Sequence, residues 1–346
     1  MANALRHGTA NVELRYLAPG DFDDAVAIDA ALIGRRRRAY FERRLQAALK
    51  APEEHVQFAA ARDGELAGYV LARRMLGEFG RAEPALRLET IGVRRELQGR
   101  GIGMRLAGEL EGWALKHGIA QIRTSAHWRN HSLLRFLDRA GFELGRHHVI
   151  DCEVHPSRLV GLEASDTGIP PSPGRTSAEV DYGAPGSNDF EALARDRADV
   201  RALAPDDLAG IASIDRALTG RNREDYLSRL VGEAMGDSAI RVSLVARRQG
   251  MIAGFVMAKT DFGDFGRTEP TAVIDAIGVH PQLAGAGIGT AMLSQLFINL
   301  HALHVQRVET VLAQENLDLL GFFHKAGFSP SSRLAFVKHI SKEMRH

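Results

Sequence analysis

The amino-acid sequence predicts two α/β domains in tandem, each with a mixed, partly antiparallel twisted sheet flanked by helices. Three observations support this fold class. The chain has 346 residues, enough for two domains of ordinary size. Segments with the two-residue periodicity of strands alternate with segments that have the periodicity of amphipathic helices. The first half of the sequence also recurs in the second half, which indicates duplication of a whole domain.

The repeat has a constant offset of 186 residues. Ile91-Gly92-Val93 returns as Ile277-Gly278-Val279, and Ala140-Gly141-Phe142 returns as Ala326-Gly327-Phe328. Such a unit is too long for a solenoid repeat. We therefore expect one domain at 10–155 and a second at 198–342. The segment between them, 156–197, is rich in Gly, Pro and Ser and is expected to be a linker.

The elements of the first copy can be assigned in order along the chain. Strands are expected at 12–17, 56–62, 66–75, 86–93, 119–126 and 143–154. Helices are expected at 20–32, 36–49, 102–117 and 132–139. Gly34 and the arginines after it separate the first two helices, and a Gly- and Pro-rich hairpin at 77–84 joins two of the strands. The apolar residues of 102–117 recur on one helical face, as in a helix that packs on a sheet.

The composition limits the classes of function. Hydrophobic residues make up 45% of the chain and charged residues 25%, with a net charge of +1. This balance is that of a soluble globular protein with no general attraction to nucleic acid or membranes. The N-terminus lacks the apolar run of a signal peptide, and the longest apolar-rich stretch, 288–305, is too polar to cross a membrane. With Cys152 as the single cysteine, we expect a cytoplasmic protein.

A glycine-rich turn stands between a strand and a helix in each copy. It reads Gln98-Gly99-Arg100-Gly101-Ile102-Gly103 in the first copy and Ala284-Gly285-Ala286-Gly287-Ile288-Gly289 in the second. Glycine permits positive φ and close backbone approach, so N–H groups at the helix start can converge on a phosphate. The alternative is a tight turn that binds nothing. A Rossmann site is disfavoured because no acidic residue ends a second parallel strand. A Walker A loop is excluded because these turns lack the sequence Gly-Lys-Ser/Thr.

Both copies resemble the GNAT superfamily of N-acetyltransferases over most of the chain. The cofactor loop of that family, Gln/Arg-x-x-Gly-x-Gly/Ala, matches the first loop in full, whereas Ala284 replaces the polar first residue in the second. The family also has an Asn followed by an apolar helix and Gly-Phe, here from Asn130 and again from Asn316. The resemblance implies transfer of an acetyl group from acetyl-CoA to a small-molecule or protein amine, without a metal.

The resemblance also implies which residues bind acetyl-CoA. Backbone groups of one strand would hold the pantetheine arm, the glycine loop would hold the pyrophosphate, and the Asn would lie near the sulfur. The expected residues are Ile91, Val93, Gln98, Gly99, Arg100, Gly101, Ile102, Gly103 and Asn130, with Ile277, Val279, Gly285, Gly287, Ile288, Gly289 and Asn316 in the second copy. Because Ala284 and Ala286 replace Gln98 and Arg100, we expect the first copy to bind more strongly.

The catalytic hypothesis rests on an acidic residue in the strand before each loop. An alkylamine has a pKa near ~10.4 and must lose a proton before it can attack. Glu89 and its counterpart Asp275 are the only acidic residues of these strands, so we nominate them as general bases acting through water. The alternative is a surface or salt-bridged carboxylate. A regular strand would place Arg87, Glu89, Ile91 and Val93 on one face, unless a bulge shifts them.

Many relatives carry a tyrosine seven residues after the Asn, which protonates the departing thiolate. This sequence departs from that pattern with Leu137 and Phe323. His131 and Ser132 are the alternative acids. A thiol with a pKa near ~8.5 is also a tolerable leaving group without an acid.

On the acceptor side, Arg35, Arg37 and Tyr40 recur in the second copy and are expected to grip a carboxylate or phosphate of the acceptor. The alternative is a helix start with solvated charges and intrahelical pairs. The two domains are expected to pack pseudo-symmetrically. The main rival function is an acyl-CoA-binding or sensing protein with degenerate catalytic machinery, and a third is a protein-interaction scaffold.

Overall fold

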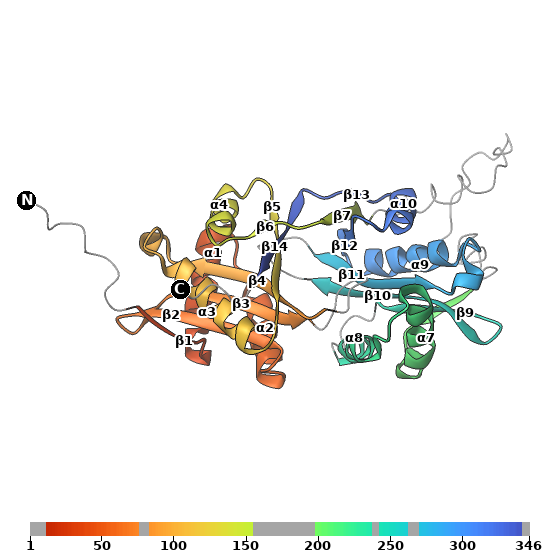
Figure 1. Ribbon diagram of the computed structural model, residues 1–346, viewed down its shortest axis with the longest axis horizontal. Helices are drawn as coiled ribbons and strands as arrows, with labels where there is room; N and C mark the ends of the chain where they lie inside the picture. The colour runs from red at the N-terminus through yellow and green to blue at the C-terminus, as the bar shows by residue number, and fades with distance from the viewer. Residues whose placement is uncertain (1–11, 76–82, 155–197, 237–241, 262–269, 341–346) are drawn as a thin grey trace, which may run out of the picture. The chain divides into compact units, whose positions relative to one another are not determined.

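The computed structural model describes residues 12–75, 83–154, 198–236, 242–261 and 270–340 (Figure 1). The expected linker at 156–197 and most of the hairpin at 77–84 lie outside these ranges. The chain forms two compact units. One contains the chain up to Val149 together with the segment from Ser331 onward, and the other contains Ile150–Asp261 and Pro270–Pro330. Within the described ranges, no helix is long and apolar enough to span a membrane.

The first repeat alternates strands and helices in the order that the sequence predicts. Its elements are β1 (Val12–Tyr16), α1 (Phe22–Ile33), α2 (Arg38–Lys50), β2 (His55–Arg62), β3 (Glu65–Met75), β4 (Ala85–Val93), α3 (Ile102–Lys116), β5 (Gln121–His127), α4 (His131–Arg139), β6 (Glu143–Leu144) and β7 (His147–Glu153). Gly34 ends α1 in the left-handed conformation, with φ of 83°, which is why the chain breaks there before α2.

The second repeat has the same order of elements. They are β8 (Asp199–Ala202), α7 (Leu208–Thr219), α8 (Glu224–Gly236), β9 (Leu244–Arg248), β10 (Met251–Asp261), β11 (Thr271–Val279), α9 (Ile288–Ala302), β12 (Arg307–Ala313), α10 (Leu317–Lys325), β13 (Ser329–Pro330) and β14 (Arg333–His339).

Each unit has one mixed sheet of seven strands. The orders are β1-β2-β3-β4-β5-β14-β6 and β13-β7-β12-β11-β10-β9-β8. The pair β4 and β5 is parallel, as is the pair β11 and β12. The other strand pairs of the first sheet are antiparallel. The predicted fold class is therefore confirmed.

The two repeats exchange their final strands. β7 and β14 occupy equivalent positions in the repeats, yet β14 pairs with β5 in the first sheet and β7 lies between β12 and β13 in the second. The ladder of β14 with β5 runs through seven residue pairs, from Arg333 opposite His127 to His339 opposite Gln121. In Figure 1 the dark blue β14 lies beside the yellow β5. The end of the chain thus completes the sheet formed by its beginning.

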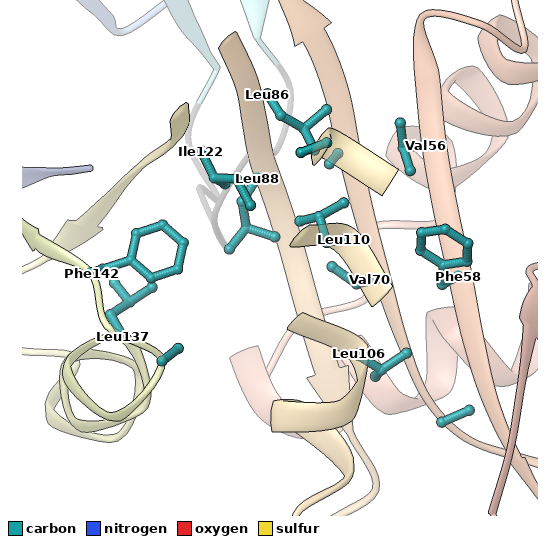
Figure 2. Close-up of a cluster of buried hydrophobic side chains, with 14 of the residues drawn as sticks. Val56, Phe58, Val70, Leu86, Leu88, Leu106, Leu110, Ile122, Leu137 and Phe142 are labelled. Atoms are coloured by element: carbon teal, nitrogen blue, oxygen red, sulfur yellow. The ribbon is translucent and has the colours of Figure 1, made fainter. Parts of the chain in front are cut away.

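Helices cover both faces of the first sheet. α3 and α4 bury one face, with a core that includes Phe58, Val70, Leu88, Leu106 and Leu110 (Figure 2). α1 and α2 bury the other face, where Ile28, Phe41, Tyr69 and Leu71 pack together. The alternation of Val70 with Tyr69 and Leu71 follows from the two-residue period of a strand. Each fully buried Leu or Phe contributes about 1.5–3 kcal/mol.

Candidate active site

The parallel strands β4 and β5 separate soon after they meet. Their ladder covers Leu86 opposite Ile122 and Arg87 opposite Arg123. At the next rung the hydroxyl of Thr124 donates to the Leu88 carbonyl at 3.1 Å. The second unit repeats this arrangement, since Thr310 donates to Ile274 at 3.0 Å. In each unit a threonine hydroxyl therefore makes the bond that a backbone amide would make if the parallel ladder continued.

Beyond this point, the backbone of β4 has an edge that faces away from β3. The amide of Arg94 donates to the Ala67 carbonyl at 2.9 Å, and backbone groups of successive residues in a strand point to opposite sides. The backbone groups of Val93 and Ile91 therefore face the diverging β5. The amide of His280 makes the same contact with Ala253 at 2.9 Å, which directs Val279 and Ile277 likewise. An extended ligand arm can add to such an edge as a strand does.

The glycine loop leads from this edge into α3. Gly99 and Gly101 have φ of 75° and 79°, which favours glycine. Gly101 is the N-cap of α3, and no side chain caps the helix there. A Cβ at Gly99 or Gly101 would meet no heavy atom within 4 Å among the described residues. The first-turn amides of α3 and the positive end of its dipole thus face an open backbone cradle, which suits a phosphate.

Gly103 has a different role. A Cβ there would come within 3.2 Å of the Phe136 ring of α4, and one on Gly289 would come within 3.1 Å of the Phe322 ring. Glycine therefore lets α4 and α10 pack against the start of α3 and α9. The buried side chains of Ile102 and Ile288, each at most 3% exposed, fix the first turn of the same helices in the cores.

Asn130 and Asn316 cap the helices that follow. The side-chain oxygen of Asn130 accepts from the Leu133 amide at 3.1 Å and from the Ser132 hydroxyl at 3.0 Å. Asn316 accepts from the Leu319 amide at 3.2 Å. Their oxygens thus satisfy the first turns of α4 and α10, and the amide nitrogen is the part of each side chain that can donate to a ligand.

Side-chain bonds hold the first loop more firmly than the second. Gln98 donates to the Val93 carbonyl at 3.1 Å, which ties the loop to β4. Arg94 donates to Asp24 of α1 at 2.9 Å and to the Leu66 carbonyl. The equivalent residues in the second repeat are Ala284, His280 and Gly210. These residues cannot make the same bonds, although Gly285 and Gly287 keep φ of 78°.

The two acidic candidates sit at β-bulges. In the ladder of β3 with β4, Leu71 lies opposite Thr90 and Ala72 lies opposite Leu88, so Glu89 is the extra residue. Asp275 is the extra residue in the second unit, because Met257 lies opposite Ala276 and Ala258 opposite Ile274. A bulge re-aims the side chain that it carries. The regular alternation from Arg87 to Val93 therefore ends at a bulge, the one exception expected from the sequence.

The carboxylate of Glu89 is buried, with the residue 4% exposed. It forms an ion pair with Arg44 of α2, on the sheet face that α1 and α2 cover. Arg44 also contacts Nδ1 of His55. Asp275 pairs instead with Lys259 at 2.8 Å, and its side chain is 13% exposed. Both carboxylates are therefore paired, and neither is a freely solvated surface group.

The expected acceptor residues are placed differently from one another. Arg37 is 7% exposed and forms a two-bond pair with Asp29, at 2.9 and 2.6 Å. Its guanidinium lies 4.8 Å from the centre of the Tyr40 ring, and Tyr40 is 5% exposed. Arg35 is exposed. Arg223 and Asp215 repeat the buried pair in the second unit.

The Asp29 pair extends toward β4 in the first unit. The Tyr69 hydroxyl donates to Asp29 at 3.1 Å and lies 3.4 Å from the Thr90 hydroxyl. Burial and the negative charge of Asp29 raise the pKa of Tyr69 well above its ordinary value, so the phenol stays protonated. Phe255 and Ala276 stand at the positions of Tyr69 and Thr90 in the second repeat. This polar chain, which ends beside the bulge, belongs to the first unit only.

Leu137 and Phe323, at the position of the family tyrosine, are both 0% exposed. Figure 2 shows Leu137 beside Phe142 in the α3-side core. Neither side chain can donate a proton. Within the described part of the chain, no cluster of three or more His, Cys, Asp or Glu forms a metal site.

The sequence carries no signal that marks Arg44, Tyr69 or Thr124 as site residues. Arg44 lies 45 residues before Glu89, and no local pattern links a helix residue to a later strand. Asp29 and Arg37 did carry a signal, because both members of the pair recur in the second repeat as Asp215 and Arg223. Such a double recurrence favours a structural ion pair over two separate contacts with a ligand.

Comparison with protein families agrees with this geometry. The model of the acetyltransferase (GNAT) family matches residues 26–142 and again 208–328. The chain belongs to this family. Each GNAT match contains one diverging strand pair and one glycine loop, and the matched ranges confirm the tandem arrangement predicted from the sequence.

Solved structures of GNAT proteins share the fold over nearly the whole chain. A tandem GNAT protein from the clavulanic acid biosynthesis pathway has 16% identity and a TM-score of 0.61, with 96% of this chain and 100% of that chain covered. A GCN5-related N-acetyltransferase from Sphaerobacter thermophilus has 17% identity and a TM-score of 0.58, with 98% and 99% covered. At these identities the likeness concerns the fold.

Proposed function

We propose that this GNAT protein is an N-acetyltransferase that moves an acetyl group from acetyl-CoA to an amine within a ternary complex. The observation that supports this most is the diverging β4–β5 pair that leads into an uncapped helix with a positive-φ glycine loop. An edge strand followed by converging amides fits an amide-containing arm that ends in a pyrophosphate. Acetyl-CoA supplies an activated thioester to this site.

Each group of the site contributes a different function to this reaction. The backbone of Ile91 and Val93 binds the pantetheine arm, and the 98–103 loop binds the pyrophosphate with Arg100 adding a charge. The amide of Asn130 donates near the thioester. Glu89 accepts the proton of the acceptor amine through water, so that the amine attacks the thioester carbonyl with its lone pair. The C–N bond forms, the C–S bond breaks, and CoA leaves as the thiolate. Arg35 contacts the acceptor from the loop between α1 and α2, while Arg37 and Tyr40 brace the start of α2 beside that loop.

The proposal gives the first unit the stronger cofactor site. Gln98 and Arg94 hold its loop in place, and Arg100 is a cation at the loop where the second repeat has Ala286. In the second unit Ile277, Val279, Gly285, Gly287, Ile288, Gly289 and Asn316 keep the backbone cradle and helix cap, with Asp275 as the matching carboxylate. A charge-assisted bond contributes roughly 1.5–3 kcal/mol, or about ten- to hundredfold in affinity. We also place the reaction in the cytoplasm, as the single cysteine suggests.

A second candidate function, binding of acyl-CoA without catalysis, is favoured by the residues at the positions of the general acid and the general base. Leu137 and Phe323 are buried apolar residues, and Glu89 is engaged by Arg44. A protein with these features that binds acyl-CoA without turning it over would act as a sensor.

Two measurements distinguish the candidates. Calorimetric titration with acetyl-CoA tests the cofactor site, and thiol release from acetyl-CoA with a panel of primary amines tests transfer. Binding together with amine-dependent release supports the enzyme. Binding without release from any amine supports the sensor, and the absence of binding rejects both.

A further inference from the structure

A basic and aromatic segment follows β5 in the first unit. His127 ends the strand, and Trp128 and Arg129 come next. The second repeat has Ala313, Gln314 and Glu315 at these positions. The segment is therefore not part of the framework that the two repeats share.

Strand exchange brings a second arginine to this segment. Arg333, the first residue of β14, lies directly opposite His127 in the antiparallel ladder, and side chains of such a pair share one face. Arg333 donates to the Ser125 carbonyl at 3.0 Å and to the Ser125 hydroxyl at 3.2 Å. These bonds direct the guanidinium along the β5 side chains of that face.

Further contacts fix the shape of the segment. The amide of Arg129 donates to Nδ1 of His127 at 3.0 Å, and the amide of Trp128 donates to the Ser332 carbonyl at 3.0 Å. The Arg129 guanidinium lies 5.1 Å from the Trp128 ring centre. Trp128 is 48% exposed, so one large aromatic surface remains open to solvent beside two arginines.

The local charge is positive. Partial burial and the charges of Arg333 and Arg129 lower the pKa of His127. The neutral ring accepts at Nδ1 and therefore carries its proton on Nε2, where it can donate. The N-terminus of α4, three residues further on, adds a partial positive charge. Together these groups offer several donors to an oxyanion.

The segment lies on the face of the sheet that also carries Glu89, the proposed base. Ile122 and Ala126 of β5 point into the core on the α3 side, so Ser125 and His127 point to the opposite face by strand alternation. The Glu89 carboxylate reaches Arg44 of α2 on that same face. The β4–β5 ladder ends with Arg87 opposite Arg123, so Glu89 lies about 7 Å and His127 about 13 Å beyond this last rung, each along its own diverging strand.

We propose that His127, Arg129 and Arg333, with Trp128 as an apolar wall, form a subsite for an oxyanion of the acceptor, which would be an amine bearing a carboxylate or phosphate. The Arg129 and Arg333 guanidinium groups bind the oxyanion, and the β4 side of the site receives the amine. The subsite of the first unit is thus completed by the last strand of the second repeat. This inference rests on the proposed acetyl transfer and names its substrate class.

The first experiment compares matched acceptors in thiol release from acetyl-CoA. Each series contains a carboxylate, its uncharged amide and a phosphonate or phosphate. The short series is glycine, glycinamide and aminomethylphosphonate, and the longer series is β-alanine, β-alaninamide and phosphoethanolamine. We expect a preference of about ten- to hundredfold for the better oxyanion over the amide. Arg129→Gln and Arg333→Gln should each remove most of that preference. Arg139→Gln, which changes an exposed arginine at the end of α4, is the matched control and should keep it.

The second experiment measures binding without turnover. In a Trp113→Phe background with CoA present, quenching of Trp128 reports binding of the N-acetyl derivatives of the same compounds. Tighter binding of the oxyanions, lost in Arg129→Gln, supports the subsite even if no amine is acetylated, in which case only the proposed enzyme function fails. Equal binding of acids and amides overturns the subsite. The subsite is also overturned if the arginine substitutions weaken binding of CoA but not of 3′-dephospho-CoA, because the arginines would then bind the 3′-phosphate of the nucleotide.

Discussion

The carboxylate of Glu89 and the guanidinium of Arg44 form a buried ion pair across the face of β4 that α2 covers. Glu89 is the bulged residue of its strand, so the bulge turns its side chain toward α2. A proton acceptor in this position is held in one orientation and shielded from solvent. Arg44 thus positions Glu89, whereas the apolar Leu230 stands at the equivalent position of the second repeat and cannot pair with a carboxylate.

The first prediction concerns Glu89→Gln. We expect turnover to fall by about 10²–10⁴-fold, with acetyl-CoA affinity unchanged, because the carboxylate acts only on the amine. Steady-state thiol release and calorimetric titration measure the two effects. Asp275→Asn is the matched control in the second unit and should leave most of the activity if the first unit carries it.

Loss of one partner from a buried pair also lowers stability, typically by about 3–5 kcal/mol. The double variant Glu89→Gln/Arg44→Leu removes both charges and should recover much of that loss, as measured by denaturant unfolding, without recovering turnover. Normal turnover in a folded Glu89→Gln protein would remove Glu89 from the mechanism.

The second prediction compares the two glycine loops. Gly101→Glu places a negative side chain at a positive-φ position in the phosphate cradle, so high-affinity binding of acetyl-CoA should be lost. Gly287→Glu should leave that binding intact, because the second loop lacks the bonds of Gln98 and Arg94. Calorimetry with each variant measures the effect. Gly108→Glu, at an exposed glycine further along α3, controls for the added charge. The opposite pattern would assign the stronger site to the second unit.

Much of the fold was available from the sequence because the duplication presented each pattern twice. The alternation of β3 and the amphipathic face of α3 follow from side-chain periodicity alone, and the glycine loops follow from the need for positive φ at Gly101 and Gly287. The strand exchange could not be predicted, since β7 and β14 have equivalent patterns and either sheet satisfies them. Periodicity indicates that a strand exists and leaves its neighbours open.

The site was predictable to a similar extent. Glu89 and Asp275 stood out as the only acidic residues of their strands, and the structure places both at bulges. Their partners, Arg44 and Lys259, lie on separate elements and depend on tertiary packing. The arginine pattern after Gly34 suggested contacts with a ligand, whereas the structure pairs Arg37 with Asp29. A buried arginine needs a carboxylate partner, and only the three-dimensional arrangement reveals which one it has.

The third prediction follows from the exchanged strand. Deletion of residues 331–346 removes all seven pairs between β14 and β5, together with the bonds of Lys338 to Glu111 and to the Ala140 carbonyl. We expect the amides of β5 to lose protection in hydrogen exchange and acetyl-CoA binding to weaken, because β5 becomes an edge strand. Deletion of 341–346 keeps every one of these pairs and is the control. Unchanged protection of β5 in the longer deletion would contradict the exchange.

The last prediction concerns the pH dependence that His127 contributes. Partial burial, Arg333 and Arg129 lower its pKa below the ordinary value of 6.5. The unfolded chain therefore binds this proton more readily than the folded protein does. Stability then rises with pH wherever the unfolded state holds more protons, so this contribution is complete above pH ~6.5 and is lost as the pH falls toward the lower pKa of the folded state.

Removal of one neighbouring charge should shift this behaviour in a defined direction. In Arg333→Gln the pKa of His127 should rise toward its ordinary value, because the like charge opposite it in the ladder is gone. An NMR titration of the His127 ring measures this directly, with His131, an exposed histidine on α4, as the internal reference. In His127→Gln the acid-side loss of stability should become smaller in unfolding experiments at pH 5 to 7. A His127 pKa that does not move when Arg333 is replaced would show that burial and Arg129 lower it without Arg333, and that Arg333 does not direct its charge at the end of β5.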